Sequence, residues 1–316
     1  MIARRCLLAA VPALGLALAL GAGPSLAADP VKVVASFSIL GDMVHEIGGE
    51  RVSLTTLVGA DGDAHVYQPT PSNARAVGAA DLLVINGLGF EGWMDRLIDS
   101  SGYKGPVVIA SQAVSPRPME EEDGHDHEAD HDHGAGDPHH EGLDPHAWQS
   151  LANGRLYLKA IADGLIAVDP AGAPTYQANL SRMIEAVDAL ETEVKRTVAA
   201  IPSANRKVVT SHDAFGYFAS AYGLSFIAPQ GVSTDAEASA SDVAALIRQI
   251  RDEKIPAVFM ENISDPRLLK RITAETGAVI GGTLYSDSLS GPTGPAPTYL
   301  KMMESNIRTL KAALAP

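Results

Sequence analysis

The sequence is poor in cysteine, in basic clusters and in long apolar runs. Its single cysteine, Cys6, opens the apolar stretch Cys6–Leu20, which follows Arg4 and Arg5. A positive start, an apolar run too short to cross a bilayer and a small-residue segment after it are typical of a secretory signal peptide, here with cleavage after Ala27. We therefore expect this leader to be removed and the mature chain to be an exported, soluble protein without a lipid anchor.

These absences restrict what the mature chain can be. Without Cys6 it has neither a disulfide nor a thiolate ligand, so a metal site would have to be built from histidine and carboxylate. No second apolar run is long enough for a membrane helix. The formal charge of −14 becomes −16 without the two leader arginines, which argues against the basic face that nucleic-acid binding requires. The remaining 289 residues suffice for two lobes with their own cores.

What the sequence does contain is a tract rich in histidine and acid, Pro118–Glu141. It holds six of the ten histidines and ten carboxylates, with no lysine or arginine. Neutral imidazole suits borderline-soft divalent ions, so this composition is typical of metal binding, and zinc is the first candidate. The alternative is a solvated acidic loop whose histidines are incidental. The six histidines are His125, His127, His131, His133, His139 and His140.

Short β-branched runs alternate with helical segments along the mature chain, a pattern that predicts mostly parallel sheets covered by helices, an α/β fold. The expected strands are Val31–Ile39, Val52–Val58, Asp81–Leu88 and Pro106–Ser111 in the first half, and Lys207–His212, Ser225–Gln230, Ala257–Glu261 and Ala278–Tyr285 in the second. Between the two sets, Thr175–Ala200 carries apolar residues three and four apart, which predicts one long helix.

We interpret this helix as a rigid linker between two α/β lobes. The alternative is an ordinary buried helix within one larger domain. The expected division is a signal peptide over 1–27, an N-terminal lobe over 28–170 that includes the tract 118–141, a linker helix over 171–201 and a C-terminal lobe over 202–316.

Three further histidines stand where a strand or a loop gives way to a helix. His65 follows an expected strand, His146 precedes an expected helix and His212 ends a strand. Ligands of open α/β folds gather at the carboxyl ends of strands, so the three are candidates for one site, and each has an acid one or two residues away to orient its ring. Taken singly, a loop histidine is more often a solvent-facing residue. His45, inside the expected helix Gly41–Ile47, is interpreted as structural or exposed.

Several motifs, in order along the chain, resemble the cluster A-I metal-binding proteins of ABC importers. The motifs are Asp63–Pro71, Ala80–Leu82, Asn86–Gly89, Glu91–Met94, Asp144–Trp148, Thr210–Tyr217 and Gly281–Ser290. Together they extend over essentially the whole mature chain, which makes the resemblance far more specific than one short pattern. It implies two Rossmann-like lobes joined by a rigid helix, with one metal held in the cleft between them.

The resemblance also implies the ligands: His65 and His146 from the first lobe, and His212 and Asp287 from the second. Manganese and iron members of the family typically have a carboxylate where this chain has His212, and three imidazoles suit Zn²⁺ better than Mn²⁺. Zinc members often carry a loop like the tract described above. Some of them complete the site with water or a loop histidine in place of Asp287. Glu261, at the end of an expected strand, is expected as an acid behind the ligands, and the alternative is that it is a ligand itself.

The implied function is capture of Zn²⁺ at one tight site and delivery to the membrane permease of an ABC importer. The tract is expected to bind further zinc weakly, accepting it from a donor such as a periplasmic metallochaperone, and the protein is expected to be a monomer. A periplasmic zinc buffer and an adhesin on the same fold stay open. A zinc hydrolase needs an open position for water. Here Asp287 takes that position, and no HExxH helix, nucleophile elbow or phosphate loop is present, so no enzyme is expected.

Overall fold

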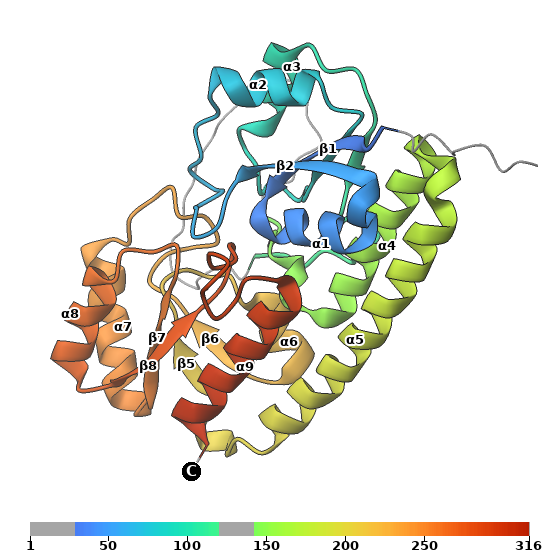
Figure 1. The fold of residues 1–316 in the computed structure, drawn as a ribbon. Helices are drawn as coiled ribbons and strands as arrows, with labels where there is room; N and C mark the ends of the chain where they lie inside the picture. The colour runs from blue at the N-terminus through green and yellow to red at the C-terminus, as the bar shows by residue number, and fades with distance from the viewer. Residues whose placement is uncertain (1–28, 120–141, 316) are drawn as a thin grey trace, which may run out of the picture.

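The computed structural model describes residues 29–119 and 142–315. The predicted signal peptide and the six histidines of the acidic tract lie outside the described residues. The rest folds into two lobes, each built on a four-stranded parallel sheet flanked by helices (Figure 1). This architecture confirms the predicted α/β fold class. Within the described ranges, none of the helices is both long enough and apolar enough to span a bilayer.

The N-terminal lobe has the strand order β2-β1-β3-β4, all parallel. Its strands are β1 (Val31–Phe37), β2 (Val52–Val58), β3 (Leu82–Ile85) and β4 (Val107–Ile109), and its helices are α1 (Ser38–Gly48), α2 (Pro71–Gly78), α3 (Met94–Ser101) and α4 (Leu151–Val168). The central strands β1 and β3 are buried on both faces over most of their length, as expected for a parallel sheet covered by helices. Thr70 begins α2 with a capping box, in which its hydroxyl and the side chain of Asn73 each bind the other's backbone N–H.

The C-terminal lobe repeats this topology with the order β6-β5-β7-β8. The strands are β5 (Lys207–Val209), β6 (Ser225–Ile227), β7 (Ala257–Glu261) and β8 (Val279–Leu284), and the helices are α6 (Gly216–Tyr222), α7 (Ala240–Glu253), α8 (Arg267–Thr276) and α9 (Tyr299–Leu314). In both lobes the carboxyl ends of the strands point toward the seam where the lobes meet. Loops that leave these strand ends therefore face each other across the seam.

One long helix, α5 (Ala173–Ala199, 27 residues), joins the lobes and runs beside α4 along the length of the molecule (Figure 1). At about 1.5 Å per residue it spans roughly 40 Å. The predicted apolar face is the face that packs inward, with Met183, Val187 and Val194 buried. The linker helix is confirmed, two residues longer at its start and one shorter at its end than predicted. The exact lobe boundaries stay a prediction.

The predicted strands are correctly placed but several are too long. Two, β2 and β7, have the predicted bounds, whereas β1 stops at Phe37 because the chain turns directly into α1 at Ser38. Similarly, β5 ends at Val209, and Thr210–His212 continues as loop. The first segment past β1 is apolar at Ile39 but belongs to α1, and the residues past β5 are polar but buried, so neither burial nor composition marks where these strands end.

Hydrogen bonds that involve side chains connect the two lobes across the seam. The indole Nε1 of Trp148 and the amide Nε2 of Gln149 both donate to the carbonyl oxygen of Ser286, at 2.9 and 2.6 Å. On the other side of the seam, the backbone N–H of Tyr299, the first residue of α9, donates to the carboxylate of Asp42 in α1 at 2.8 Å. The two lobes are therefore held together by buried polar contacts as well as by the linker.

Candidate metal centre

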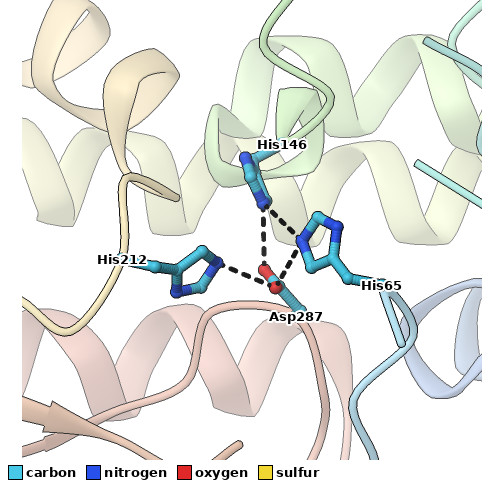
Figure 2. Close-up of side chains that lie close together, drawn as sticks. All are labelled: His65, His146, His212 and Asp287. Atoms are coloured by element: carbon cyan, nitrogen blue, oxygen red, sulfur yellow. Dashed lines mark hydrogen bonds and ion pairs between the residues drawn. The ribbon is translucent and has the colours of Figure 1, made fainter. Parts of the chain in front are cut away.

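Four side chains predicted as ligands, His65, His146, His212 and Asp287, converge at the seam (Figure 2). One potential ligand atom of each lies within 4.8 Å of those of the other three. The side chain of His65 is 5% exposed, and the other three are fully buried. Loops place all four: His65 follows β2, His146 lies just before α4, His212 follows β5 and Asp287 follows β8.

The atoms that face one another are the Nε2 atoms of the imidazoles and the carboxylate oxygens of Asp287. Nε2 of His65 lies 3.3 Å from Nε2 of His146 and 3.2 Å from Oδ2 of Asp287. Oδ1 of Asp287 lies 3.5 Å from Nε2 of His146, and its Oδ2 lies 3.0 Å from Nε2 of His212. Ligands about 2.0–2.1 Å from a tetrahedral zinc ion are about 3.3–3.4 Å apart, so these separations suit a four-coordinate ion.

Carboxylates fix the rings of two of the histidines by contacting Nδ1. Oδ1 of Asp144 lies 2.9 Å from Nδ1 of His146 and also accepts its backbone N–H at 2.9 Å. Oε2 of Glu261 lies 2.7 Å from Nδ1 of His212, while its Oε1 accepts the backbone N–H groups of Ser211 and His212 at 2.7 and 2.9 Å. Carboxylates in this position keep Nδ1 protonated and leave Nε2 free for a metal.

The charges of the centre are strongly coupled. Burial alone would lower the pKa of His146, but the charge of Asp287 and hydrogen bonds to Asp144 and Asp287 raise it to about 9. Burial likewise opposes protonation of His212, yet Glu261 and Asp287 hold its pKa well above its ordinary value. Burial would raise the pKa of Asp287, but His146 and His212 hold it well below the ordinary range. In the absence of a cation, protonated His146 and His212 therefore compensate the negative charge of the buried carboxylates.

The acids next to each histidine in the sequence do not all take the expected place. Asp144 contacts the imidazole of His146, as expected. Asp63, by contrast, accepts the backbone N–H of His65 at 2.9 Å rather than its ring, and also accepts the hydroxyl of Thr234 from the other lobe at 2.6 Å. The carboxylate that contacts the imidazole of His212 is that of Glu261, which lies behind the ligands as expected.

A buried network that the motifs did not predict supports His146. Glu91 accepts the hydroxyl of Ser36 at 2.6 Å and the backbone N–H of Asn86 at 2.7 Å, and burial raises the pKa of Glu91. The amide of Asn86 in turn donates to the carbonyl oxygen of Pro145 at 3.0 Å, directly before His146. The sequence signal was an asparagine and a glutamate just after an apolar strand, but their partners are distant in sequence.

His45 is not part of the centre. It is exposed on α1, which agrees with the prediction that it is structural or exposed.

Two α/β lobes bridged by one long helix, with a buried cluster of ligand-type side chains between them, define the cluster A-I substrate-binding proteins of ABC importers. Comparison with known proteins agrees. The model of the ZnuA family, described as zinc-uptake complex component A, periplasmic, matches residues 33–313. The chain belongs to this family of periplasmic metal-binding proteins. Its members are binding proteins rather than enzymes, which confirms the expectation that this protein is not an enzyme.

Characterised relatives in this family are named for different metals. The manganese-binding lipoprotein MntA of Halalkalibacterium halodurans is 32% identical over 93% of this chain and 91% of its own. The iron-binding protein YfeA of Yersinia pestis is 32% identical over 91% of this chain and 87% of its own. The structure of the periplasmic zinc binding protein TroA from Treponema pallidum superposes with a TM-score of 0.81 at 29% identity, covering 91% of this chain and all of TroA.

Proposed function

We propose that the protein captures Zn²⁺ in the periplasm and delivers it to the membrane permease of an ABC importer. The observation that carries the choice of metal is the donor set, three imidazoles and one carboxylate, within a seam that provides four converging ligand atoms. Oxygen-rich sites suit Mn²⁺, whereas imidazole suits Zn²⁺. Because relatives are named for manganese, iron and zinc, the family alone does not select among these metals.

In this mechanism each lobe supplies two ligands, so the bound ion links the lobes across the seam. Occupancy replaces the protons of the imidazoles by a divalent cation, which changes how strongly the loops that carry His65 and Asp287 are held. An ion that is coordinated by both lobes shifts the protein toward the conformation in which all four ligands reach it. We expect small tilts and loop ordering rather than wide hinge closure, since α5 and the seam hydrogen bonds connect the lobes. The permease would then distinguish loaded from empty protein.

Metal selectivity tests this proposal directly. Elemental analysis of protein isolated from its native compartment should find one tightly held zinc per chain, beyond any weakly held metal that dialysis removes. In competition with a chromophoric chelator, Mn²⁺ should displace zinc poorly. If manganese were the native metal, or competed equally, the zinc assignment would be wrong while the family assignment would stand.

Zinc binding should release protons at neutral pH. The carboxylates raise the pKa of His146 to about 9 and that of His212 well above its ordinary value, so both rings bind protons in the metal-free protein at pH 7. A ligand imidazole must be neutral, and affinity should therefore rise with pH from about 6 to 9, with nearly two protons released per zinc at pH 7. Calorimetry in buffers of different ionisation enthalpy measures this number, and a value near zero would contradict the assigned ligands.

We expect the histidine-rich tract to speed the capture of zinc and to supply no ligand to the tight site. Its two ends are paired, with Met119 N donating to Gly142 O at 2.7 Å and Asp144 N to Arg117 O at 2.9 Å. Residues 120–141 can therefore be replaced by an Asn-Gly turn that preserves this short ladder. A polar, charge-rich segment must be ordered by each metal it binds, so its sites should be weak. Its negative charge should nevertheless raise the rate of capture, an effect that salt diminishes.

Titration of this deletion variant should show one tight zinc site and loss of the weaker sites only. Stopped-flow loading should be slower than in the full chain at low salt. Loss of the tight site would show that the tract supplies a primary ligand. Unchanged stoichiometry and loading rate would remove any metal role for it.

The remaining parts of the proposal concern location and partners. We propose that the leader is cleaved after Ala27 and that the protein is a soluble monomer, unlike the relative MntA, which is named a lipoprotein. The mass of the exported protein tests the cleavage position and the lack of a lipid. A periplasmic metallochaperone as zinc donor would be identified by direct transfer to the metal-free protein, faster than release of zinc to a chelator.

A further inference from the structure

His65 differs from the other two histidines of the centre in how its ring is held. His146 and His212 each have a carboxylate against Nδ1. In the described part of the chain, no carboxylate lies within ion-pair distance of Nδ1 of His65; its contacts with His146 and Asp287 are made by Nε2. Its ring therefore needs another constraint if Nε2 is to face the centre.

That constraint is the ring of Phe90. The centroids of the two rings lie 4.7 Å apart at an interplanar angle of 74°, an edge-to-face contact. Phe90 is only 1% exposed and is itself fixed by two aromatic neighbours, Phe37 and Trp148, with centroid distances of 4.9 Å to each. Edge-to-face pairs at this separation prefer defined orientations, so Phe90 can fix the direction of the imidazole as a carboxylate would.

Two of these aromatic rings, those of Phe90 and Trp148, border the centre on the side of the N-terminal lobe. The centroid of Trp148 lies 5.4 Å from that of His146, and Phe90 lies 6.0 Å from it. Trp148 is fully buried, and its Nε1 donates to Ser286 O, one residue before Asp287. The wall is thus apolar toward the ligands and anchored to the opposite lobe.

We propose that Phe90 is a positioning residue that sets the orientation of His65 and excludes water from the N-terminal side of the coordination sphere, so that it determines selectivity for Zn²⁺ over Mn²⁺. This inference rests on the proposed function. Zn²⁺ is satisfied by four ligands, whereas Mn²⁺ prefers additional oxygen ligands, which water would have to provide. A wall that leaves no room for water disfavours the larger coordination number. Groups that orient a metal ligand typically change affinity by about 10- to 100-fold.

The test compares Phe90→Leu, which stays apolar but loses the ring edge, and Phe90→Ala, which also opens space, with Phe218→Leu as control. Phe218 is fully buried, and its ring contacts are Tyr222 and Phe226, not a ligand histidine. Each protein is loaded with Co²⁺ alone, whose visible d–d absorption is intense in four-coordinate sites and weak in six-coordinate ones. Zinc and manganese affinities are then measured by competition.

We expect the wild type and Phe218→Leu to give the intense spectrum. Phe90→Leu should lose about tenfold in zinc affinity, and Phe90→Ala should also show weakened absorption with a zinc-to-manganese affinity ratio at least about tenfold lower. Wild-type spectra and ratios in both Phe90 variants would overturn the inference, as would equal losses in the control. Failure of the wild type to bind cobalt or zinc tightly would instead overturn the proposed function.

Discussion

Replacing His146 by alanine should weaken zinc binding by about 100- to 1,000-fold. Four-ligand zinc sites bind with about 10–16 kcal/mol, so the loss of one ligand in four corresponds to about 2.5–4 kcal/mol. His146 is fully buried, and its Nε2 lies 3.3 Å from Nε2 of His65, so water would have to enter the seam to replace it. Chelator competition with zinc measures the change, and His65→Ala and His212→Ala should behave alike.

His45→Ala is the matched control for these three variants. His45 is exposed on α1 and lies outside the cluster, so its loss should leave the zinc affinity unchanged. Circular dichroism should show the native fold in all four proteins, since the three centre histidines lie in loops rather than in a strand or helix of the core. Wild-type zinc affinity in any one of the three variants would remove that residue from the ligand set.

Truncation of Glu261 should have the largest effect on stability. Its carboxylate accepts two backbone N–H groups and lies 2.7 Å from Nδ1 of His212, all in a buried environment. Glu261→Ala leaves these donors without an acceptor, and breaking a buried charged pair in this way costs about 3–5 kcal/mol. Equilibrium unfolding of the metal-free protein by urea measures the loss at neutral pH. A change below about 1 kcal/mol would show that water or another group satisfies the donors.

Glu261→Gln separates stability from metal binding at the same position. A glutamine carbonyl can still accept the backbone N–H groups of Ser211 and His212, so the fold should be largely retained. Its amide NH₂, however, would face Nδ1 of His212 and favour the tautomer with the proton on Nε2, the atom that faces Asp287. We expect zinc affinity to fall by about 10- to 100-fold. Unchanged zinc affinity would show that Glu261 does not set the tautomer.

The sequence predicted the parts of the centre that depend on local position. His65, His146 and His212 stand at strand or loop ends, and in a parallel α/β fold such positions collect at one edge. Asp287 carries no comparable local signal, and it was placed only through the family resemblance. The strand order, the contact between Glu261 and Nδ1 of His212, and the support of Pro145 by Asn86 join residues far apart in the chain. Contacts between residues far apart in the chain cannot be predicted from local patterns of hydrophobicity.

The aromatic residues beside the centre could not be predicted from the sequence either. Phe37, Phe90 and Trp148 come from three separate segments, and each by itself resembles an ordinary core residue. Only the fold shows that the rings of Phe90 and Trp148 lie against ligand histidines, with Phe37 packed against both rings. Likewise, the ends of β1 and β5 could not be read from composition, because Ile39 after β1 is as apolar as the strand but belongs to α1, and Thr210–His212 after β5 are buried but lie outside the strand.

The unbroken helix α5, together with the hydrogen bonds of Trp148 and Asp42 across the seam, has a consequence for the kinetics of unloading. Lobes already held together need no free energy from the ion to close, so the intrinsic affinity is not reduced by a rarely populated competent state. At a dissociation constant of about 1 nM and an association rate constant of roughly 10⁷ M⁻¹s⁻¹, the mean residence time is about 100 s. For the proposed import function, release at this rate would be slow, so docking on the transporter would have to accelerate it. His65 is the least enclosed of the four ligands, so the docked transporter would reach it first.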